Sequence, residues 1–494
     1  MENICQVLNL MEKRTKGRRV IRYMKGTEVL DINGEEFFKM IRRHAHILKS
    51  KGVTGKHVGI IGKNSYLWLV NFCAVFQAGA VAVLLDRDLG NEELAELVSR
   101  VDLSVILYDA STEDAVQRMV CPMQVEILDM EEMASGKIHM DSNKVDEVSW
   151  EMTQKPEELS CIIFTSGTTM RNKAVMLSAR AMAASVCTRV NGKIFKSLLA
   201  IMPFHHLSGF ITVMNAMYLG AEICIGEDIK YFYRYLKYMQ PDYVFVVPSM
   251  LQLLVKKLKN GGQNGCALGW NLRLITCGGA TFCSDFLQML QERKITVMQG
   301  YGASEAGGIG ILWEMTSKRP DTLGKPPAEM SVRIENEELY LKSDSLMMGY
   351  YDDPEETEKV LRDGWYATGD LCRIDGDGYL YLTGRRKNLI ILPNGENISP
   401  EEIENKLRNC EEIEEIMIDV EGNFIAAKVF PYYPAGSTEE QKAGIREKIG
   451  KIIEAYNGNL PLYKQVMKVH FFDRPFEKNT AGKIIRYHIA EGMV

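Results

Sequence analysis

Hydrophobic and polar positions alternate in two ways along the first part of the chain. Residues 34–53 repeat apolar side chains about every 3.6 positions, which predicts an amphipathic helix. Short apolar runs at residues 57–62, 101–108 and 124–128 predict buried strands. Helices that alternate with buried strands indicate parallel sheets covered by helices, so we expect an α/β fold.

One uncharged stretch, residues 67–85, is long enough to suggest a membrane span. Two side-chain amides and a glycine interrupt it, however. We therefore expect a buried helix over residues 65–78, with Ser65 or Asn64 as its N-cap, and then a buried strand over residues 80–85.

The pattern changes twice in the second half of the chain. Residues 179–300 repeat the strand–helix alternation, whereas residues 330–384 carry short strands with Gly/Asp turns, which predicts a β-rich subdomain. A charged break follows, and capping-box patterns at Ser399 and Thr438 then predict helices among further strands. We expect an N-terminal domain over residues 1–384, a hinge at residues 385–388 and a small α+β domain over residues 389–494.

The amino-acid composition limits which binding partners and which cellular compartment we expect. The formal net charge of −6 gives no general attraction to nucleic acid or to an anionic membrane. The eleven cysteines include no C-x-x-C pair and no His/Cys cluster with zinc spacing, so we expect reduced thiols in a cytoplasmic protein. The first residues lack the uninterrupted apolar core of a signal peptide.

A polar loop between two apolar runs, residues 161–164 and 174–177, is the strongest chemical motif. Its glycine lets backbone N–H groups approach an anion, its hydroxyls can donate hydrogen bonds, and its lysine supplies a positive charge. The candidate phosphate contacts are Thr165, Ser166, Gly167, Thr168, Thr169 and Lys173. An exposed Ser/Thr turn would give the same pattern, and the spacing is not that of a Walker loop.

Other charged side chains follow tight turns. Glu305 could cap a helix or bind Mg²⁺, which needs only one or two protein carboxylates. Asp370 could accept hydrogen bonds from ribose hydroxyls, with Arg385 as a second contact, or both could belong to plain surface turns. His206 lies shortly before Gly209 and is well placed to reach a ligand, and Lys483 lies in a tail that could simply be exposed.

Together these motifs resemble those of the adenylate-forming superfamily, which includes acyl-CoA and aryl-CoA synthetases, adenylation domains of peptide synthetases and firefly luciferase. The resemblance extends from about Asn64 to Arg486. Residues 58–68 and 78–86 also resemble the superfamily's N-terminal signatures, and residues 395–404 resemble its segment beyond the hinge. It implies an ATP-dependent acid–thiol ligase. Such an enzyme forms an acyl-adenylate, releases pyrophosphate and transfers the acyl group to coenzyme A, with Mg²⁺ as the metal.

The resemblance also implies a role for each motif. The loop from Thr165 to Lys173 would bind the β- and γ-phosphates of ATP, and Glu305 would coordinate Mg²⁺. Lys483 would bridge the substrate carboxylate and the α-phosphate, and Lys387 would be the hinge of a mobile C-terminal domain. The remaining implied contacts are Asp370 and Arg385 with ribose, Tyr301, Gly302 and Ser304 near the nucleotide, Gly278, Gly279 and Ala280 around adenine and the acyl group, and His206 along the path of the carboxylate.

Several questions stay open at this point. Met170, Asn172 and Ala174 stand where the superfamily usually has Gly, Pro and Gly, so pyrophosphate release could differ. The acceptor could be the phosphopantetheine of a carrier protein instead of coenzyme A, and an oxidative luciferase-like enzyme or a non-catalytic nucleotide sensor are further alternatives. A pocket lined by Phe210, Met214, Gly279 and Ala303 would favour a fatty or aromatic acid, and nothing predicts the oligomeric state.

Overall fold

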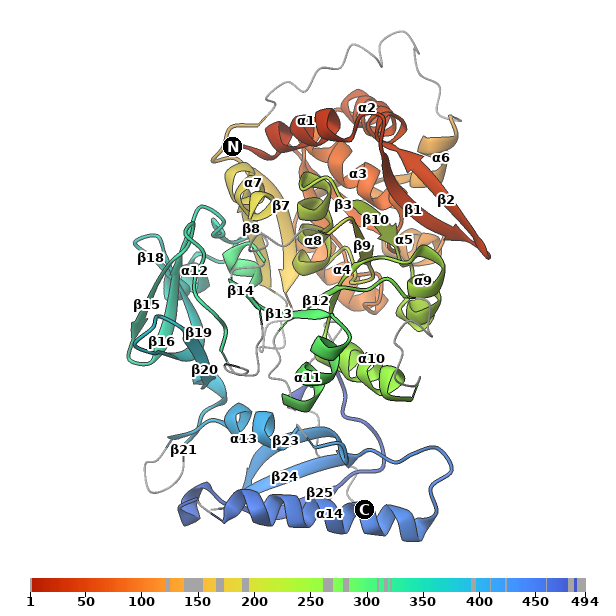
Figure 1. Ribbon diagram of the computed structural model, residues 1–494. Coiled ribbons are helices and arrows are strands. Elements are labelled where there is room, and N and C mark those ends of the chain that lie inside the picture. Colours follow the sequence, from red (N-terminus) through yellow and green to blue (C-terminus); the bar gives the residue numbers. More distant parts are fainter. Residues whose placement is uncertain are drawn as a thin grey trace.

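The computed structural model describes most of the chain. The described residues are 2–120, 125–136, 154–165, 173–188, 195–260, 270–278, 284–308, 311–314, 319, 322–391, 397–408, 410–422, 424–458, 460–478 and 484–486. They form two large helix-covered sheets, a smaller β-rich unit beside them and a C-terminal α+β unit at one end (Figure 1). The predicted α/β fold with a small α+β C-terminal domain is confirmed.

The first large sheet has seven strands in the order β17-β8-β7-β4-β3-β5-β6. Its strands are β3 (His57–Ile61), β4 (Val81–Leu84), β5 (Leu103–Tyr108), β6 (Glu126–Asp129), β7 (Leu159–Thr165), β8 (Lys173–Ser178) and β17 (Gly349–Tyr350). Helix α2 (Gly34–Ser50) precedes β3, and the helices between the strands are α3 (Tyr66–Gln77), α4 (Asn91–Arg100), α5 (Glu113–Val120) and α6 (Met130–Ser135). β3 to β7 pair in parallel, whereas β8 returns antiparallel to β7, so the loop between β7 and β8 closes a hairpin.

Helix α3 and strand β4 account for the uncharged stretch. The Ser65 hydroxyl accepts a 3.0 Å hydrogen bond from the backbone of Trp68, as expected for the N-cap. Trp68 and Phe72 stack with ring centres 5.2 Å apart, and every residue of α3 from Leu67 onward is buried. Among the described residues, no helix combines the length and the apolar character needed to cross a membrane.

The second large sheet has eight strands in the order β14-β13-β12-β11-β9-β10-β1-β2. These are β1 (Arg19–Lys25), β2 (Glu28–Asn33), β9 (Ser197–Ala200), β10 (Glu222–Ile225), β11 (Tyr243–Val246), β12 (Leu274–Gly278), β13 (Thr296–Tyr301) and β14 (Ile311–Glu314). The associated helices are α1 (Ile4–Thr15), α7 (Ala179–Cys187), α8 (Leu207–Tyr218), α9 (Phe232–Met239), α10 (Pro248–Asn260) and α11 (Ser284–Glu292), with a 3-10 turn, η2, at Ile229–Tyr231.

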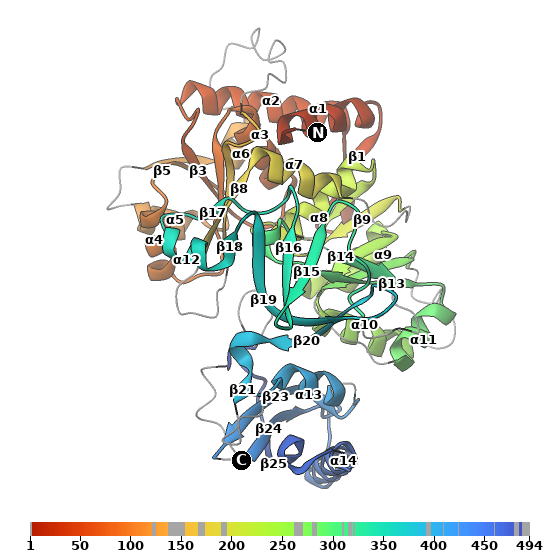
Figure 2. The same ribbon diagram turned by 90° about the vertical axis from the view of Figure 1, so that its left-hand side faces the viewer.

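The central hydrophobic core lies between the two sheets. It gathers buried side chains from α1, α2, α3, α7 and α8, and smaller clusters cover the outer face of each sheet (Figures 1 and 2). Strand side chains alternate between these layers: Leu198 and Ala200 lie in the central core, and Leu199 lies in the outer cluster with α9 and α10.

A five-stranded sheet forms the β-rich unit, in the order β15-β16-β19-β18 with β20 paired to β19. Its elements are β15 (Ser331–Glu335), β16 (Glu338–Lys342), α12 (Pro354–Val360), β18 (Leu361–Arg362), β19 (Trp365–Ile374) and β20 (Leu380–Arg385). All its neighbouring strands are antiparallel. The predicted β-rich subdomain is therefore present at the expected place in the chain.

The C-terminal unit has a hydrophobic cluster of its own. It contains β21 (Ile390–Ile391), β22 (Asn397–Ile398), α13 (Pro400–Leu407), β23 (Ile413–Glu421), β24 (Phe424–Pro431), α14 (Glu439–Asn457), η6 (Leu462–Lys464) and β25 (Val466–Phe471). Thr438 and Gln441 form the predicted capping box, and the Ser399 hydroxyl accepts from the Glu402 backbone. The domain boundaries at residues 384 and 388 stay a prediction; a 3-10 turn, η5 (Arg386–Asn388), occupies this place.

Candidate active site

Strand pairing brings a cation, a phenol and a carboxylate together at one edge of the first sheet. β17 pairs with β8, so that Tyr350 lies opposite Val175, two residues from Lys173. β13 ends at Tyr301, and the 3-10 turn η4 (Ser304–Ala306) that follows carries Glu305. The Glu305 carbonyl accepts a 2.9 Å hydrogen bond from the backbone of Met347, which ties this turn to the segment leading into β17.

Tyr350 connects the two charges. Its hydroxyl donates a 2.9 Å hydrogen bond to Glu305 Oε1, and the Lys173 ammonium lies 4.7 Å from the centre of its ring. Burial, reinforced by the Glu305 charge, raises the pKa of the Tyr350 phenol, so it stays protonated and donates. Lys173 also forms an ion pair of 3.7 Å with Glu356. The ammonium of Lys173, at the start of β8, therefore lies between the Tyr350 ring and the Glu356 carboxylate.

Asp370 is the centre of a second set of contacts. The pairing of β19 with β20 sets Asp370 opposite Arg385, and Arg385 Nε lies 2.8 Å from Asp370 Oδ1. The Tyr301 hydroxyl donates a 2.6 Å hydrogen bond to Asp370 Oδ2. Burial and the neighbouring carboxylate raise the pKa of Tyr301 well above its usual value. Burial opposes the charge of Arg385, but Asp370 and the other acidic groups nearby, among them Glu401, together outweigh burial, and the pKa of this guanidinium is raised.

The turn that carries Asp370 is fixed by its own hydrogen bonds. The buried Glu338 accepts from the backbone of Gly369 at 3.0 Å and pairs with Arg386 at 2.7 Å. The Thr368 hydroxyl accepts from the backbone of Asp370 and donates to the carbonyl of Leu339. Asp370 is therefore held in one orientation before any ligand binds.

The structure adds residues that sequence reasoning missed. Tyr350, Glu338 and Arg386 join the candidate residues, as does Tyr366, a buried phenol whose pKa is raised by burial and by Glu305. Their positions result from pairings between distant strands, so no local pattern marks them. Lys387, the predicted hinge residue, is exposed in η5.

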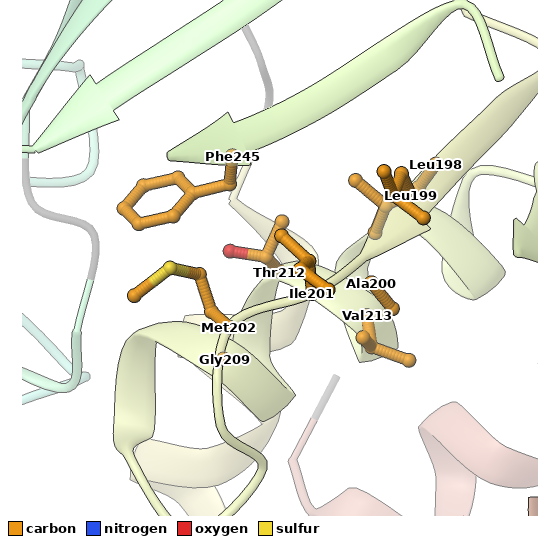
Figure 3. A pocket seen from close by; sticks show the side chains of 9 residues that line it. All are labelled: Leu198, Leu199, Ala200, Ile201, Met202, Gly209, Thr212, Val213 and Phe245. Atoms are coloured by element: carbon orange, nitrogen blue, oxygen red, sulfur yellow. The ribbon is translucent and has the colours of Figure 1, made fainter. Parts of the chain in front are cut away.

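A small apolar cavity lies at the end of β9, between α8 and β11 (Figure 3). Its lining residues are Leu198, Leu199, Ala200, Ile201, Met202, Gly209, Thr212, Val213 and Phe245. The Phe245 ring lies close to Gly278 at the end of β12, where an added Cβ would be 3.2 Å from it. Phe210 and Met214, which were expected to line the acid pocket, are fully buried in the central core, where the ring of Phe210 lies 4.8 Å from that of Phe72. Their part in binding the acid stays a prediction.

His206 begins α8, next to His205 and close to Asp86 at the end of β4. The other predicted residues near the nucleotide occupy the ends of β13 and η4: Gly302 is exposed, and Ala303 and Ser304 are half-buried. Several predicted site residues lie outside the described ranges, namely Ser166, Gly167, Thr168, Thr169, Met170, Asn172, Gly279, Ala280 and Lys483.

Two family models match this chain. The model of the AMP-binding enzyme matches residues 12–351, and that of the AMP-binding enzyme C-terminal domain matches residues 387–492. Together they account for most of its length.

Curated relatives and solved structures agree with these matches. A 2-succinylbenzoate–CoA ligase of Oceanobacillus iheyensis is 27% identical over 501 residues and covers 96% of each chain, and a feruloyl-CoA synthase of Amycolatopsis sp is 27% identical over 75% of this chain and 77% of its own. The o-succinylbenzoate CoA synthetase (MenE) of Bacillus subtilis in complex with its acyl-adenylate intermediate superposes with a TM-score of 0.79 at 21% identity, over 98% of each chain. The amide bond synthetase McbA of Marinactinospora thermotolerans has a TM-score of 0.78 at 20% identity, over 97% of this chain and 98% of its own.

Proposed function

Because this chain belongs to the family of AMP-binding enzymes, we propose that it is an acid–thiol ligase that uses ATP to join a carboxylic acid to coenzyme A. The observation that carries the proposal is the meeting of Lys173, Tyr350 and Glu305 at the edge of the β7–β8 hairpin. A cation and a carboxylate beside a hydroxyl-rich loop that contains a glycine suit a nucleoside triphosphate and its metal ion.

We assign the nucleotide to the two sets of contacts described above. Lys173 and the loop from Thr165 would hold the β- and γ-phosphates. Asp370, supported by Tyr301 and Arg385, would accept hydrogen bonds from the ribose. Gly278 to Ala280 and Gly302 to Ser304 would border the base and the acyl group. The fixed orientation of Asp370 would spare the complex the cost of ordering that side chain on binding.

Glu305 fits Mg²⁺ as a hard oxygen ligand. It is half-buried and its Oε1 accepts one hydrogen bond, from Tyr350. Mg²⁺ takes one or two protein carboxylates together with phosphate oxygens, so a single glutamate is sufficient. When bound, the ion would neutralise phosphate charge during adenylate formation.

Lys483 and His206 are proposed to act on the acid. A carboxylate is repelled by the α-phosphate, and the Lys483 ammonium would offset both charges while the acyl-adenylate forms and pyrophosphate leaves. His206, at the start of α8, would border the path of the acid. Rotation of the C-terminal unit about Lys387 would then withdraw Lys483 and admit the thiol.

We propose an aromatic or fatty acid as the substrate, because the side chains expected around it, such as Phe210, Met214 and Ala303, are apolar. The acids in the names of the relatives, 2-succinylbenzoate and ferulate, both carry an aromatic ring. We further propose a cytoplasmic location, since the eight described cysteines are free thiols and a reducing compartment preserves them.

A panel of aromatic and fatty acids, assayed for pyrophosphate release with ATP, tests this function. At least one acid should give release in the parent chain, and Glu305→Gln should slow it at saturating Mg²⁺. Product formed with coenzyme A but not with a phosphopantetheinylated carrier protein supports the ligase; the reverse supports a carrier-loading enzyme. Nucleotide binding without release for every acid would favour a non-catalytic sensor.

A further inference from the structure

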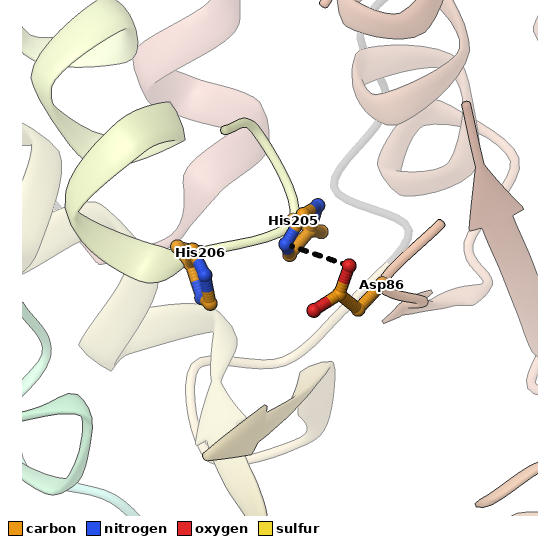
Figure 4. Close-up of side chains that lie close together, drawn as sticks. All are labelled: Asp86, His205 and His206. Carbon is orange, nitrogen blue, oxygen red and sulfur yellow. Dashed lines mark ion pairs between the residues drawn. The ribbon is translucent and has the colours of Figure 1, made fainter. Parts of the chain in front are cut away.

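Three metal-ligand side chains converge beside the proposed acid path without a role in ATP binding. Asp86 follows β4 of the first large sheet, and His205 and His206 follow β9 of the second (Figure 4). One potential ligand atom from each lies within 4.8 Å of the other two. Asp86 and His205 are buried and His206 is half-buried.

Asp86 and His205 approach each other closely, but not in the geometry of a well-aligned hydrogen bond. His205 Nε2 lies 3.2 Å from Asp86 Oδ1, yet it finds no well-aligned hydrogen-bond partner among the described residues. Burying a ring nitrogen without a hydrogen-bond partner costs free energy, because its hydrogen bond to water is lost and not replaced. Two ligand atoms of one tetrahedral Zn²⁺ ion, each about 2.1 Å from it, are separated by about 3.4 Å. The observed spacing therefore suits two ligands of a single ion.

The backbone around the cluster is held rigidly. Asn64, at the start of α3, donates to the carbonyls of Met202 and Gly226 and accepts from the backbone of Phe204 at 2.9 Å. On the other side, the backbone of Asp88 donates to Asp86 Oδ1 at 2.9 Å. The imidazole rings of His205 and His206 lie 4.4 Å apart at an angle of 55°, so they do not stack face to face. The side chains are thus brought together by structure that does not depend on an ion.

We propose that Asp86, His205 and His206 form a binding site for a divalent transition-metal ion of the Zn²⁺ class. Two imidazoles are borderline ligands, and together with one carboxylate they suit Zn²⁺ or Co²⁺ better than Mg²⁺, which prefers oxygen ligands only. The site is therefore chemically distinct from Glu305, which offers only oxygen. Because its ligands come from both large sheets, a bound ion would clamp the end of β4 to the turn after β9.

Direct metal binding tests the site without reference to catalysis. The full chain, stripped with a chelator, is titrated with Co²⁺ and with Zn²⁺ under reducing conditions. The parent should bind one equivalent of Co²⁺, with the visible bands of nitrogen and oxygen ligands and without an intense thiolate charge-transfer band. Asp86→Asn and His205→Gln should each weaken binding at least tenfold.

The C-terminal unit supplies a matched control. His470 Nε2 lies 2.6 Å from Glu421 Oε1, which makes a second histidine–carboxylate pair far along the chain. His470→Gln should leave Co²⁺ affinity unchanged. Unchanged affinity in both Asp86→Asn and His205→Gln, or a spectrum dominated by thiolate, would overturn the proposal. If one of these variants does not fold, the other still gives the comparison.

A second experiment measures pyrophosphate release and therefore rests on the proposed function. Zn²⁺ at this site would hold His206, so it should inhibit pyrophosphate release, and His205→Gln should relieve that inhibition while responding to Mg²⁺ as the parent does. Inhibition that is equal in parent and variant contradicts the site as the cause. If the chain binds Co²⁺ as expected but releases no pyrophosphate, the proposed ligase activity is contradicted and the metal site is not.

Discussion

The hydroxyl of Tyr350 donates a 2.9 Å hydrogen bond to Glu305, 45 residues away in the sequence, while its ring lies against the Lys173 ammonium. The same side chain thus orients the proposed metal ligand and contacts the proposed phosphate ligand. It reaches both because β17 adds to the edge of the first large sheet beside β8.

Tyr350→Phe should lower kcat/KM for ATP by about tenfold. A hydrogen bond to a charged group contributes about 1.5 kcal/mol, and its loss leaves Glu305 less firmly oriented. The measurement is steady-state pyrophosphate release at varied ATP. Tyr351→Phe is the control, because this neighbouring ring packs edge-on against His57, 5.5 Å away, and not against Glu305. Equal effects of the two changes would argue against a positioning role for Tyr350.

Substitutions at Lys483 and Lys387 should each impair a different half-reaction of the proposed cycle. Lys483→Ala should slow adenylate formation by about a hundredfold to a thousandfold, the cost of losing one charge contact in the transition state. It should largely spare thioester formation from a synthetic acyl-adenylate. Lys387→Pro fixes one backbone angle in η5, and it should leave adenylate formation near normal while blocking transfer to the thiol.

Both variants are assayed with ATP plus acid, and separately with acyl-adenylate plus coenzyme A. Similar damage by both changes in both assays would mean that the C-terminal unit does not alternate between two positions.

Gly209→Ala should destabilise the turn that carries His205 and His206. An added Cβ at this position would lie 2.1 Å from the Pro203 carbonyl oxygen, so the first turn of α8 would have to move away. We expect a loss of about 2 kcal/mol or more in the free energy of unfolding. Gly450→Ala in α14 is the control: it meets open space and should be neutral or stabilising in the same denaturant titration. Equal stability of the two variants would contradict this contact.

His44 should make the stability of the N-terminal domain depend on pH. It is fully buried in α2, where its Nδ1 lies 3.0 Å from Asn71 Oδ1, and burial lowers its pKa to about 4. The unfolded chain, with a histidine pKa of about 6.5, binds the proton first as the pH falls. About 2 kcal/mol of stability present above pH 6.5 should therefore be lost by about pH 5.

The measurement is the difference in unfolding free energy between pH 7 and pH 5. His44→Gln should reduce it by that amount, and the half-buried His46→Gln should not. An unchanged pH dependence in His44→Gln would show that another group is responsible.

The helices and strands that could be predicted from the sequence are those buried on every face or on one face only. β3, β4 and α3 are continuous apolar segments, and the N-caps at Ser65 and Thr438 mark helix starts by local chemistry. β1 was not predicted because its charged residues Arg19, Arg22 and Lys25 interrupt the apolar positions. β23 was missed for the same reason, since three glutamates interrupt its apolar positions.

The residues of the candidate site also fall into two groups: those that the local sequence marks and those that only the fold brings together. Glu305, Asp370 and Lys173 follow tight turns or flank a polar loop, so local sequence was enough to select them. Tyr350 and Asp86 act through contacts between sheets or between distant strands, which sequence spacing does not encode. For Phe210 the assignment stays a prediction, because a helix that is apolar on nearly every face gives no sign of which face meets a ligand.

The pairing of β1 with β10 joins two strands that the ribosome synthesises far apart in time. Ile21 and Ile223 are direct partners, separated by roughly 200 residues of chain. A ribosome that adds roughly 5–20 residues per second needs roughly 10–40 s to make that interval. Until then, Ile4, Leu8 and Met11 of α1 lack α7 and α8 to cover them. The apolar face of α1, which is made first, is therefore completed only after more than 200 further residues have been synthesised.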